Sequence, residues 1–274
     1  MNIIQTIILA IVQGVTELFP ISSVGHSVIT PYIFGWKLAP TFLKENFLPF
    51  VVMMHLGTTI ALLIYFWRDW AEVIKSIFDG KKSSKKLLIL IIVGTLPAAI
   101  IGFVFEKKFN SIFSSVMGAS FFLIINGFLL FFGEKAKSKG KKEIEDLTYK
   151  EAAVVGLFQS LALIPGFSRS GSSMTAGFWV GLKHEASAKF SMLLATPIIA
   201  GAAVLEIHKL FTPQNRALLQ TSIIGGAVAG VCALISVTLL MKWFNKKEVN
   251  AMGPFAIYCW LLGGLVLISN FIKF

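Results

Sequence analysis

Three residues near the amino terminus have the types and spacing of a hydrolytic site. Glu17 lies in an apolar stretch, and Ser23 and His26 follow it closely. A serine hydroxyl becomes a useful nucleophile when a base takes its proton, and either a histidine or a carboxylate can be that base. Ser23 and His26 are three residues apart, so they could meet across one turn of a helix. The alternative is that Ser22 or Ser23 only caps this helix.

Gln13 lies one helical turn before Glu17. The two residues are four positions apart, so they share one face of a helix that ends at Pro20. A carboxylate in an apolar segment is expensive to bury, and a functional role is the default interpretation. The alternative is a glutamate that hydrogen-bonds the backbone at the helix break. We assign Gln13 a supporting role beside Glu17.

Arg169 lies in a second polar cluster that is rich in serine and glycine. The planar guanidinium matches the oxygens of a phosphate group, and a turn that leads into a helix adds backbone N–H donors. The predicted phosphate ligands are Ser22, Arg169, Ser170 and Ser173. The alternative is an arginine that bonds backbone carbonyls and stabilises the turn.

Both clusters interrupt apolar regions, 1–35 and 151–182, which would otherwise be helical. Proline, glycine and hydroxyl residues break them at 20–26 and 165–173. Within a membrane, the freed backbone groups must be satisfied by protein or by a polar cavity. Each region therefore predicts a re-entrant helical hairpin whose tip lines a polar site.

The composition places these hairpins in a membrane protein. Of 274 residues, 55% are hydrophobic and 14% are charged, whereas about 25% are charged in an ordinary soluble domain. The net charge of +11 comes from short basic runs between apolar segments, which argues against a nucleic-acid partner. Cys232 and Cys259 have no metal-ligand spacing and are interpreted as packing residues. Six segments are predicted to span the bilayer: 47–67, 87–105, 115–133, 187–208, 217–241 and 252–271.

The basic residues predict the orientation. Segments 68–86, 134–150, 183–189 and 242–250 hold 17 of the 25 Lys and Arg residues and are expected in the cytoplasm. The opposite loops are 36–46, 106–114 and 209–216. The first hairpin then enters from the outer face and the second from the cytoplasmic face.

Residues 1–274 are therefore expected to form one membrane domain with two repeats of inverted topology. Repeat 1 covers approximately 1–133 and repeat 2 approximately 151–274, joined by a cytoplasmic basic loop at 134–150. Paired interrupted helices of this kind are common in transporters, so a lipid-phosphate or anion transporter is the rival function.

Other polar residues receive structural interpretations. His55, His184 and His208 are isolated in the sequence and are expected to have interfacial or structural roles. Asn126, inside an apolar span, is expected to form a helix–helix hydrogen bond.

The two clusters, read as motifs, resemble a known family. GVTELFPISSVGH at 14–26 and FQSLALIPGFSRSGSS at 158–173 are similar to the signature regions of the bacterial undecaprenyl-diphosphate phosphatases, also called bacitracin-resistance proteins. The resemblance extends over essentially the whole chain, including GPFAIYCW at 253–260. It implies an all-α polytopic fold, with an inverted-topology repeat, six transmembrane helices and two re-entrant helical hairpins.

The resemblance also implies an activity. The family hydrolyses undecaprenyl diphosphate to undecaprenyl phosphate and inorganic phosphate, which recycles the lipid carrier for cell-wall synthesis and confers bacitracin resistance. The implied partners are this polyprenyl diphosphate and membrane lipid, with a homodimer as one assembly that the sequence leaves open. The implied location is the bacterial plasma membrane, with the active site facing the exterior. Site roles transfer by motif to four residues: Glu17 of the (E/Q)xxxE motif, Ser23 as nucleophile, His26 of SSxGH and Arg169 as phosphate ligand.

Two positions depart from the family pattern. Gln13 stands where many members have Glu, which removes one negative charge. This weakens any arrangement in which two carboxylates hold a divalent cation, Mg²⁺ or Ca²⁺, and leaves Glu17 as the candidate ligand. Ser173 stands where Thr is common, and its hydroxyl can still donate to phosphate. The sequence leaves two mechanisms open: attack by Ser23 through a phosphoenzyme, or direct attack by activated water.

Overall fold

The computed structural model describes residues 1–38, 46–79, 82–112, 115–135, 140–206, 216–246 and 250–272. Within these ranges the chain forms α-helices, two short 3₁₀ segments, η2 (Ile144–Asp146) and η3 (Ser160–Leu163), and one isolated β-bridge between Lys142 and Leu182. The helices are α1 (Ile3–Thr16), α2 (Ser23–Ile33), α3 (Phe47–Tyr65), α4 (Trp67–Asp79), α5 (Lys82–Ile112), α6 (Val116–Lys135), α7 (Tyr149–Gln159), α8 (Arg169–Trp179), α9 (His184–Glu206), α10 (Arg216–Lys246) and α11 (Gly253–Ile272).

Five helices are long and apolar enough to cross a membrane, namely α5, α6, α9, α10 and α11. They confirm five of the six predicted spans. The sixth prediction, 47–67, falls on α3, which passes the same criteria only together with α4, at an 80° bend between them. The described chain therefore has five candidate spans, or six if the bent pair counts as one.

The segment 68–86 was expected to be a loop, and this was wrong, whereas its cytoplasmic location stays a prediction. It holds most of α4 and the start of α5. Its charged residues suggested a loop, but they alternate with apolar ones at helical spacing, such as Trp67, Trp70 and Ile74. Helix α5 likewise continues to Ile112, through most of the predicted loop 106–114. Within the other predicted loops, positions 39–45, 136–139, 209–215 and 247–249 lie outside the described residues, as does His208.

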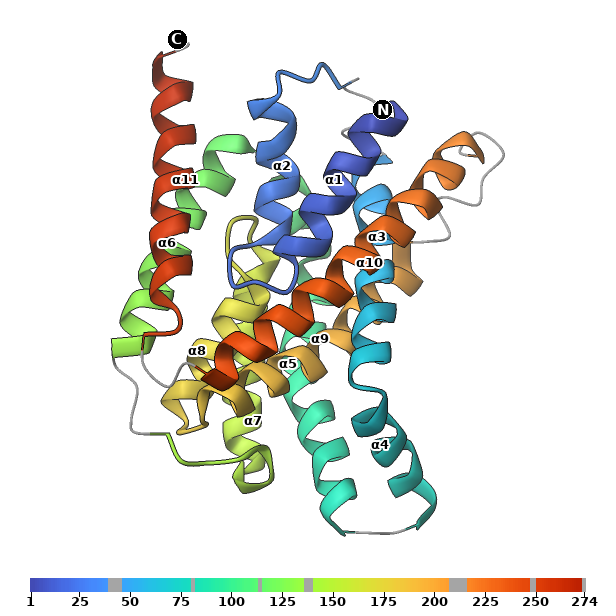
Figure 1. Ribbon diagram of the computed structural model, residues 1–274, viewed down its shortest axis with the longest axis vertical. Helices are drawn as coiled ribbons and strands as arrows, with labels where there is room; N and C mark the ends of the chain where they lie inside the picture. The colour runs from blue at the N-terminus through green and yellow to red at the C-terminus, as the bar shows by residue number, and fades with distance from the viewer. Residues whose placement is uncertain are drawn as a thin grey trace.

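The two interrupted regions form helical hairpins that approach from opposite ends of the molecule. Figure 1 shows α1 and α2 at the end that holds both chain termini, and α7 toward the other end of the molecule. Their turns meet near the middle of the molecule. Gly166 lies at this meeting point with φ of 108°, where a Cβ would lie 2.3 Å from the carbonyl oxygen of Ala119. The backbone of the second turn therefore requires glycine at this position.

Asn126, in the middle of α6, bridges the two turns. Its Nδ2 donates to the carbonyl oxygen of Pro20 at 3.0 Å, and its Oδ1 accepts from the backbone N–H of Ser168 at 3.0 Å. The side chain is fully buried. The expected helix–helix hydrogen bond is present as a long contact, because Nδ2 also donates to Cys259 Sγ of α11 at 3.5 Å. The two shorter bonds go to backbone groups that the helix breaks set free and that an apolar interior would otherwise leave without partners.

Candidate active site

Glu17 lies at the centre of the buried polar contacts. It follows the last turn of α1 and is 6% exposed. Gln13 Nε2 donates to Glu17 Oε2 at 2.9 Å, which confirms that the two side chains share one face of the helix. The hydroxyl of Ser23 donates to the same carboxylate oxygen at 2.5 Å. A base and a candidate nucleophile are therefore already in contact.

Ser22 and Ser23 have different roles in the structure. Ser22 is the N-cap of α2, and its hydroxyl accepts from the backbone N–H of Gly25 at 3.2 Å. It adopts this position with φ of 67°, an uncommon value for a serine. Ser23 bonds Glu17 instead. The capping alternative thus holds for Ser22 alone, although both residues line the cavity described below.

Arg169 brings the second hairpin to the first. It is the first residue of α8, which is capped by Ser168. Arg169 Nη2 lies 3.3 Å from Glu17 Oε1, and Nη1 donates to the carbonyl oxygen of Ser191 at 3.2 Å. Two residues separated by 152 positions are therefore joined as an ion pair at the point where the turns meet.

His55 completes the surroundings of Glu17, and sequence analysis missed this role. Its Nε2 lies 3.0 Å from Glu17 Oε2, and its Nδ1 lies 2.8 Å from the carbonyl oxygen of Val51. A carbonyl only accepts, so Nδ1 carries a hydrogen, and a second proton must lie between Nε2 and the carboxylate. His55 is a polar residue inside the predicted span 47–67, and this signal could have identified it. The same reasoning had identified Glu17 as a polar residue in an apolar region.

His26 is turned away from this group. Its Nδ1 lies 2.6 Å from the carbonyl oxygen of Ser22, and its Nε2 lies 2.8 Å from the hydroxyl of Tyr258 on α11. The imidazole and phenol rings stack with 5.6 Å between centroids. Both ring nitrogens are engaged, and none of these bonds reaches Ser23. The structure therefore does not bring the predicted Ser23–His26 pair together.

The serines that follow Arg169 hold α8 in place. Ser170 Oγ donates to the carbonyl oxygen of Phe19 at 3.1 Å. Ser173 Oγ donates to the carbonyl oxygen of Arg169 at 2.8 Å and lies 2.7 Å from Ser191 Oγ. Neither hydroxyl lines the cavity. Their predicted part in phosphate binding stays a prediction, and their visible role is to position Arg169.

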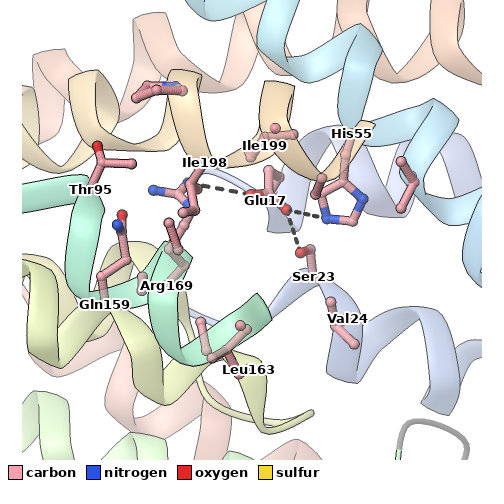
Figure 2. Close-up of a pocket in the computed structure, with 18 of the residues that line it drawn as sticks. Glu17, Ser23, Val24, His55, Thr95, Gln159, Leu163, Arg169, Ile198 and Ile199 are labelled. Atoms are coloured by element: carbon pink, nitrogen blue, oxygen red, sulfur yellow. Dashed lines mark hydrogen bonds and ion pairs between the residues drawn. The ribbon is translucent and has the colours of Figure 1, made fainter. Parts of the chain in front are cut away.

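A cavity of about 760 Å³ adjoins these residues. Its polar end includes Glu17, Ser23, His55 and Arg169, drawn in Figure 2 with the ion pairs and hydrogen bond that join them. The rest of the wall is mainly apolar and comes largely from α5 and α9: Ala98, Ala99, Gly102, Phe103, Pro197, Ile198, Ile199, Gly201, Ala202 and Val204. Such a space fits a molecule with an anionic head and a hydrocarbon tail.

The protein side chains alone do not form a divalent-cation site at Glu17. Ca²⁺ favours six to eight oxygen ligands, and Mg²⁺ is usually held by one or two carboxylates together with water and substrate phosphates. Here Gln13 supplies an amide in place of a carboxylate, and Glu17 already has Arg169 and His55 as partners. Among the described residues, no three His, Cys, Asp or Glu side chains are placed to bind one ion.

Comparison with known proteins supports the family resemblance that the two motifs indicated. The model of the bacitracin resistance protein BacA family matches residues 6–265. The chain is 62% identical to undecaprenyl-diphosphatase 2 of Oenococcus oeni over 270 residues, which cover 98% of this chain and 99% of that protein. It is 43% identical to undecaprenyl-diphosphatase 2 of Chromobacterium violaceum, covering 99% and 100%. It is also 43% identical to the undecaprenyl-diphosphatase of Acidiphilium cryptum, covering 96% of each. This chain therefore belongs to the bacitracin resistance protein BacA family.

Proposed function

We propose that the protein hydrolyses undecaprenyl diphosphate to undecaprenyl phosphate and inorganic phosphate. The observation that carries this proposal is the contact of Glu17 with both Ser23 and Arg169 at the polar end of a largely apolar cavity. The diphosphate occupies the polar end, and the polyprenyl chain lies along the apolar wall. The relatives named undecaprenyl-diphosphatase support the same substrate.

The bonding of Ser23 favours a nucleophilic role. Its hydroxyl proton points to Glu17, so the oxygen lone pairs remain available to a phosphorus atom in the cavity. Attack on the terminal phosphorus passes the proton to Glu17 and breaks the bond to the bridging oxygen, which leaves with undecaprenyl phosphate. Water then cleaves the phosphoserine. The competing route has water attack directly, with Glu17 as base and Ser23 as a positioning group.

Arg169 stabilises the charge on the transferred phosphoryl oxygens, and His55 orients the charged Glu17. Phosphoryl transfer is catalysed mainly by positioning and by stabilising charge on the transferred oxygens. Arg169 is at the site where that charge develops, and it shares its donors between Glu17 and the phosphate. His55 holds Glu17 in the orientation that receives the serine proton.

The direct test is phosphate release by the purified protein in detergent. Undecaprenyl diphosphate is the substrate, and both inorganic phosphate and the lipid monophosphate are measured. Equal amounts of the two products are expected. A transporter that lacks hydrolysis, the rival function, would yield neither product and would contradict the proposal.

His55→Leu is expected to lower kcat about 100-fold, because Glu17 would lose the partner that orients it and a misplacement of a catalytic group can cost a factor of this order. His55→Gln keeps a donor that can reach Glu17, and it is expected to recover most of the loss. The pair of variants is compared by kcat in detergent at fixed pH. Failure of Gln to recover activity would contradict a positioning role and would indicate that His55 itself transfers a proton.

The architecture we propose is a repeat of inverted topology, 1–133 and 151–274. The opposite approach of α1–α2 and α7–α8 supports it. The cavity is lined by the first half of α3, at Val51 and Val52, and by the second half of α9, from Pro197 to Val204. The first half of α3 lies toward the end that holds the chain termini. The basic segments predict that this end is exterior, and we propose that the site opens outward.

Orientation is tested with single cysteines in a background that lacks Cys232 and Cys259. A cysteine at Lys37, exposed after α2, should react with a membrane-impermeant thiol reagent on intact spheroplasts. A cysteine at Glu145, exposed on η2, should react only after the membrane is opened. Labelling in the reverse pattern would place the site on the cytoplasmic face.

A further inference from the structure

Gln159 is a buried polar residue in the cavity wall that the mechanism above does not use. It is the last residue of α7 and is 2% exposed. Neither Oε1 nor Nε2 has a hydrogen-bond partner among the described residues. The same holds for Nε of Arg169, which lines the same cavity. Buried polar atoms are nearly always hydrogen-bonded, so three unpaired ones beside one cavity indicate a missing ligand.

The position of Gln159 is fixed by close helix packing. A Cβ on Gly156 would lie 2.0 Å from the carbonyl oxygen of Gly94, so α7 and α5 are in direct backbone contact there. This contact brings Gln159 opposite Thr95 of α5. Figure 2 shows the amide of Gln159 beside Thr95 and Arg169, across the guanidinium from Glu17 and Ser23. The polar end of the cavity therefore extends to both sides of Arg169.

The donors on the Gln159 side fit a phosphate that is held but not attacked. The amide nitrogen of Gln159 and Nε of Arg169 can both donate to phosphate oxygens, and among the described residues neither atom is hydrogen-bonded to a nucleophile or a base. Gln159 Oε1 can accept from a protonated phosphate oxygen or from water. Since the amide is neutral, it adds selectivity without holding the product as strongly as a second cation would.

We propose that Gln159 and Arg169 Nε form a second phosphate subsite, which binds the phosphate that remains attached to the lipid. Ser23, on the other side of Arg169, then faces the terminal phosphate. The apolar wall continues from this subsite, through Ala162 and Leu163 after Gln159 and through Ala98 and Ala99 after Thr95. A lipid tail leaving the inner phosphate has a direct path along it. This inference rests on the proposed function and specifies how a diphosphate is selected over a monophosphate.

The test compares two inert probes, methylenebisphosphonate with two phosphonate groups and methylphosphonate with one. Binding is measured as the concentration dependence of the thermal unfolding temperature in detergent, which needs no turnover. The wild-type protein should bind the bisphosphonate more tightly. Gln159→Leu should weaken bisphosphonate binding about 10- to 100-fold, the factor expected for a hydrogen bond to a charged group, and should leave methylphosphonate binding unchanged. The KM for undecaprenyl diphosphate should rise by a similar factor, with a smaller change in kcat.

Controls separate this role from a structural one. Gln159→Leu removes unpaired polar atoms, so its unfolding temperature without ligand should equal or exceed that of the wild type. If the leucine variant does not fold, Gln159→Met replaces it at matched length. Ser222→Ala removes another buried unpaired oxygen, one outside the cavity lining, and should leave both probes unaffected.

Equal weakening of both probes, or an unchanged preference for the bisphosphonate, would overturn the subsite. Wild-type protein that prefers the bisphosphonate yet releases no phosphate from the lipid would contradict the proposed hydrolysis while retaining the subsite. The two failures are therefore distinguishable.

Discussion

Arg169→Ala is expected to abolish phosphate release from undecaprenyl diphosphate, with a loss of about 10³-fold or more in kcat/KM, as for other arginines that stabilise a transferred phosphoryl group. The diphosphate would enter a largely apolar cavity without its cation, and Glu17 would lose the guanidinium that lies 3.3 Å away. Arg169→Lys should recover little, because an ammonium cannot contact Glu17, Ser191 and a phosphate at once in the geometry of a planar fork.

The control for this variant is another arginine. Arg68 is exposed at the start of α4, where it contacts the ring of Trp67, and it does not line the cavity. Arg68→Ala should therefore retain activity. Both variants are checked for a single species in detergent by size-exclusion chromatography. A folded Arg169→Ala protein with near-normal turnover would show that Arg169 does not bind the phosphate.

Ser23→Ala is expected to lower kcat by about 10³-fold or more, because the best-studied nucleophilic serines cost this much or more when removed. Ser22→Ala is the matched control, since it removes the adjacent hydroxyl, which caps α2 instead of bonding Glu17. That variant should lose stability, by about 0.5–2 kcal/mol for a lost cap, with a much smaller loss of activity.

Detection of the phosphoserine separates the two mechanisms. Brief incubation with substrate labelled in the terminal phosphate, followed by acid quenching, should leave label on Ser23 in the wild-type protein. If Ser23→Ala turns over at a near-normal rate, the covalent route is eliminated and direct attack by water remains. Equal and mild losses in both serine variants would instead mean that neither hydroxyl is the nucleophile.

The sequence predicted much of this site because its central contacts are local. Gln13 and Glu17 meet through helix periodicity, and Ser23 follows across one turn. Arg169 was assigned to the same site because its guanidinium matches the oxygens of a phosphate, whereas its ion pair with Glu17 was not predicted. Five of the six predicted spans followed from apolar length, which the bilayer imposes directly, whereas 47–67 qualifies only together with α4.

Contacts between distant helices could not be predicted in this way. Three-residue spacing suggested that His26 would face Ser23, but Tyr258 on α11 bonds its ring, and no local pattern encodes that partner. His55 meets Glu17 only because α3 packs beside α1. Helix α4 was missed because charges were counted without asking which face of a helix they occupy.

The bridge formed by Asn126 bears on how the protein moves during turnover. Its two hydrogen bonds join turns that belong to different halves of the chain. Parting the turns would leave a carbonyl of one and an N–H of the other without partners in a place that water does not reach. Rocking of one half against the other would therefore meet a steep barrier at its centre. We therefore expect the reactive groups to stay fixed relative to one another during turnover, while the lipid moves between the bilayer and the cavity.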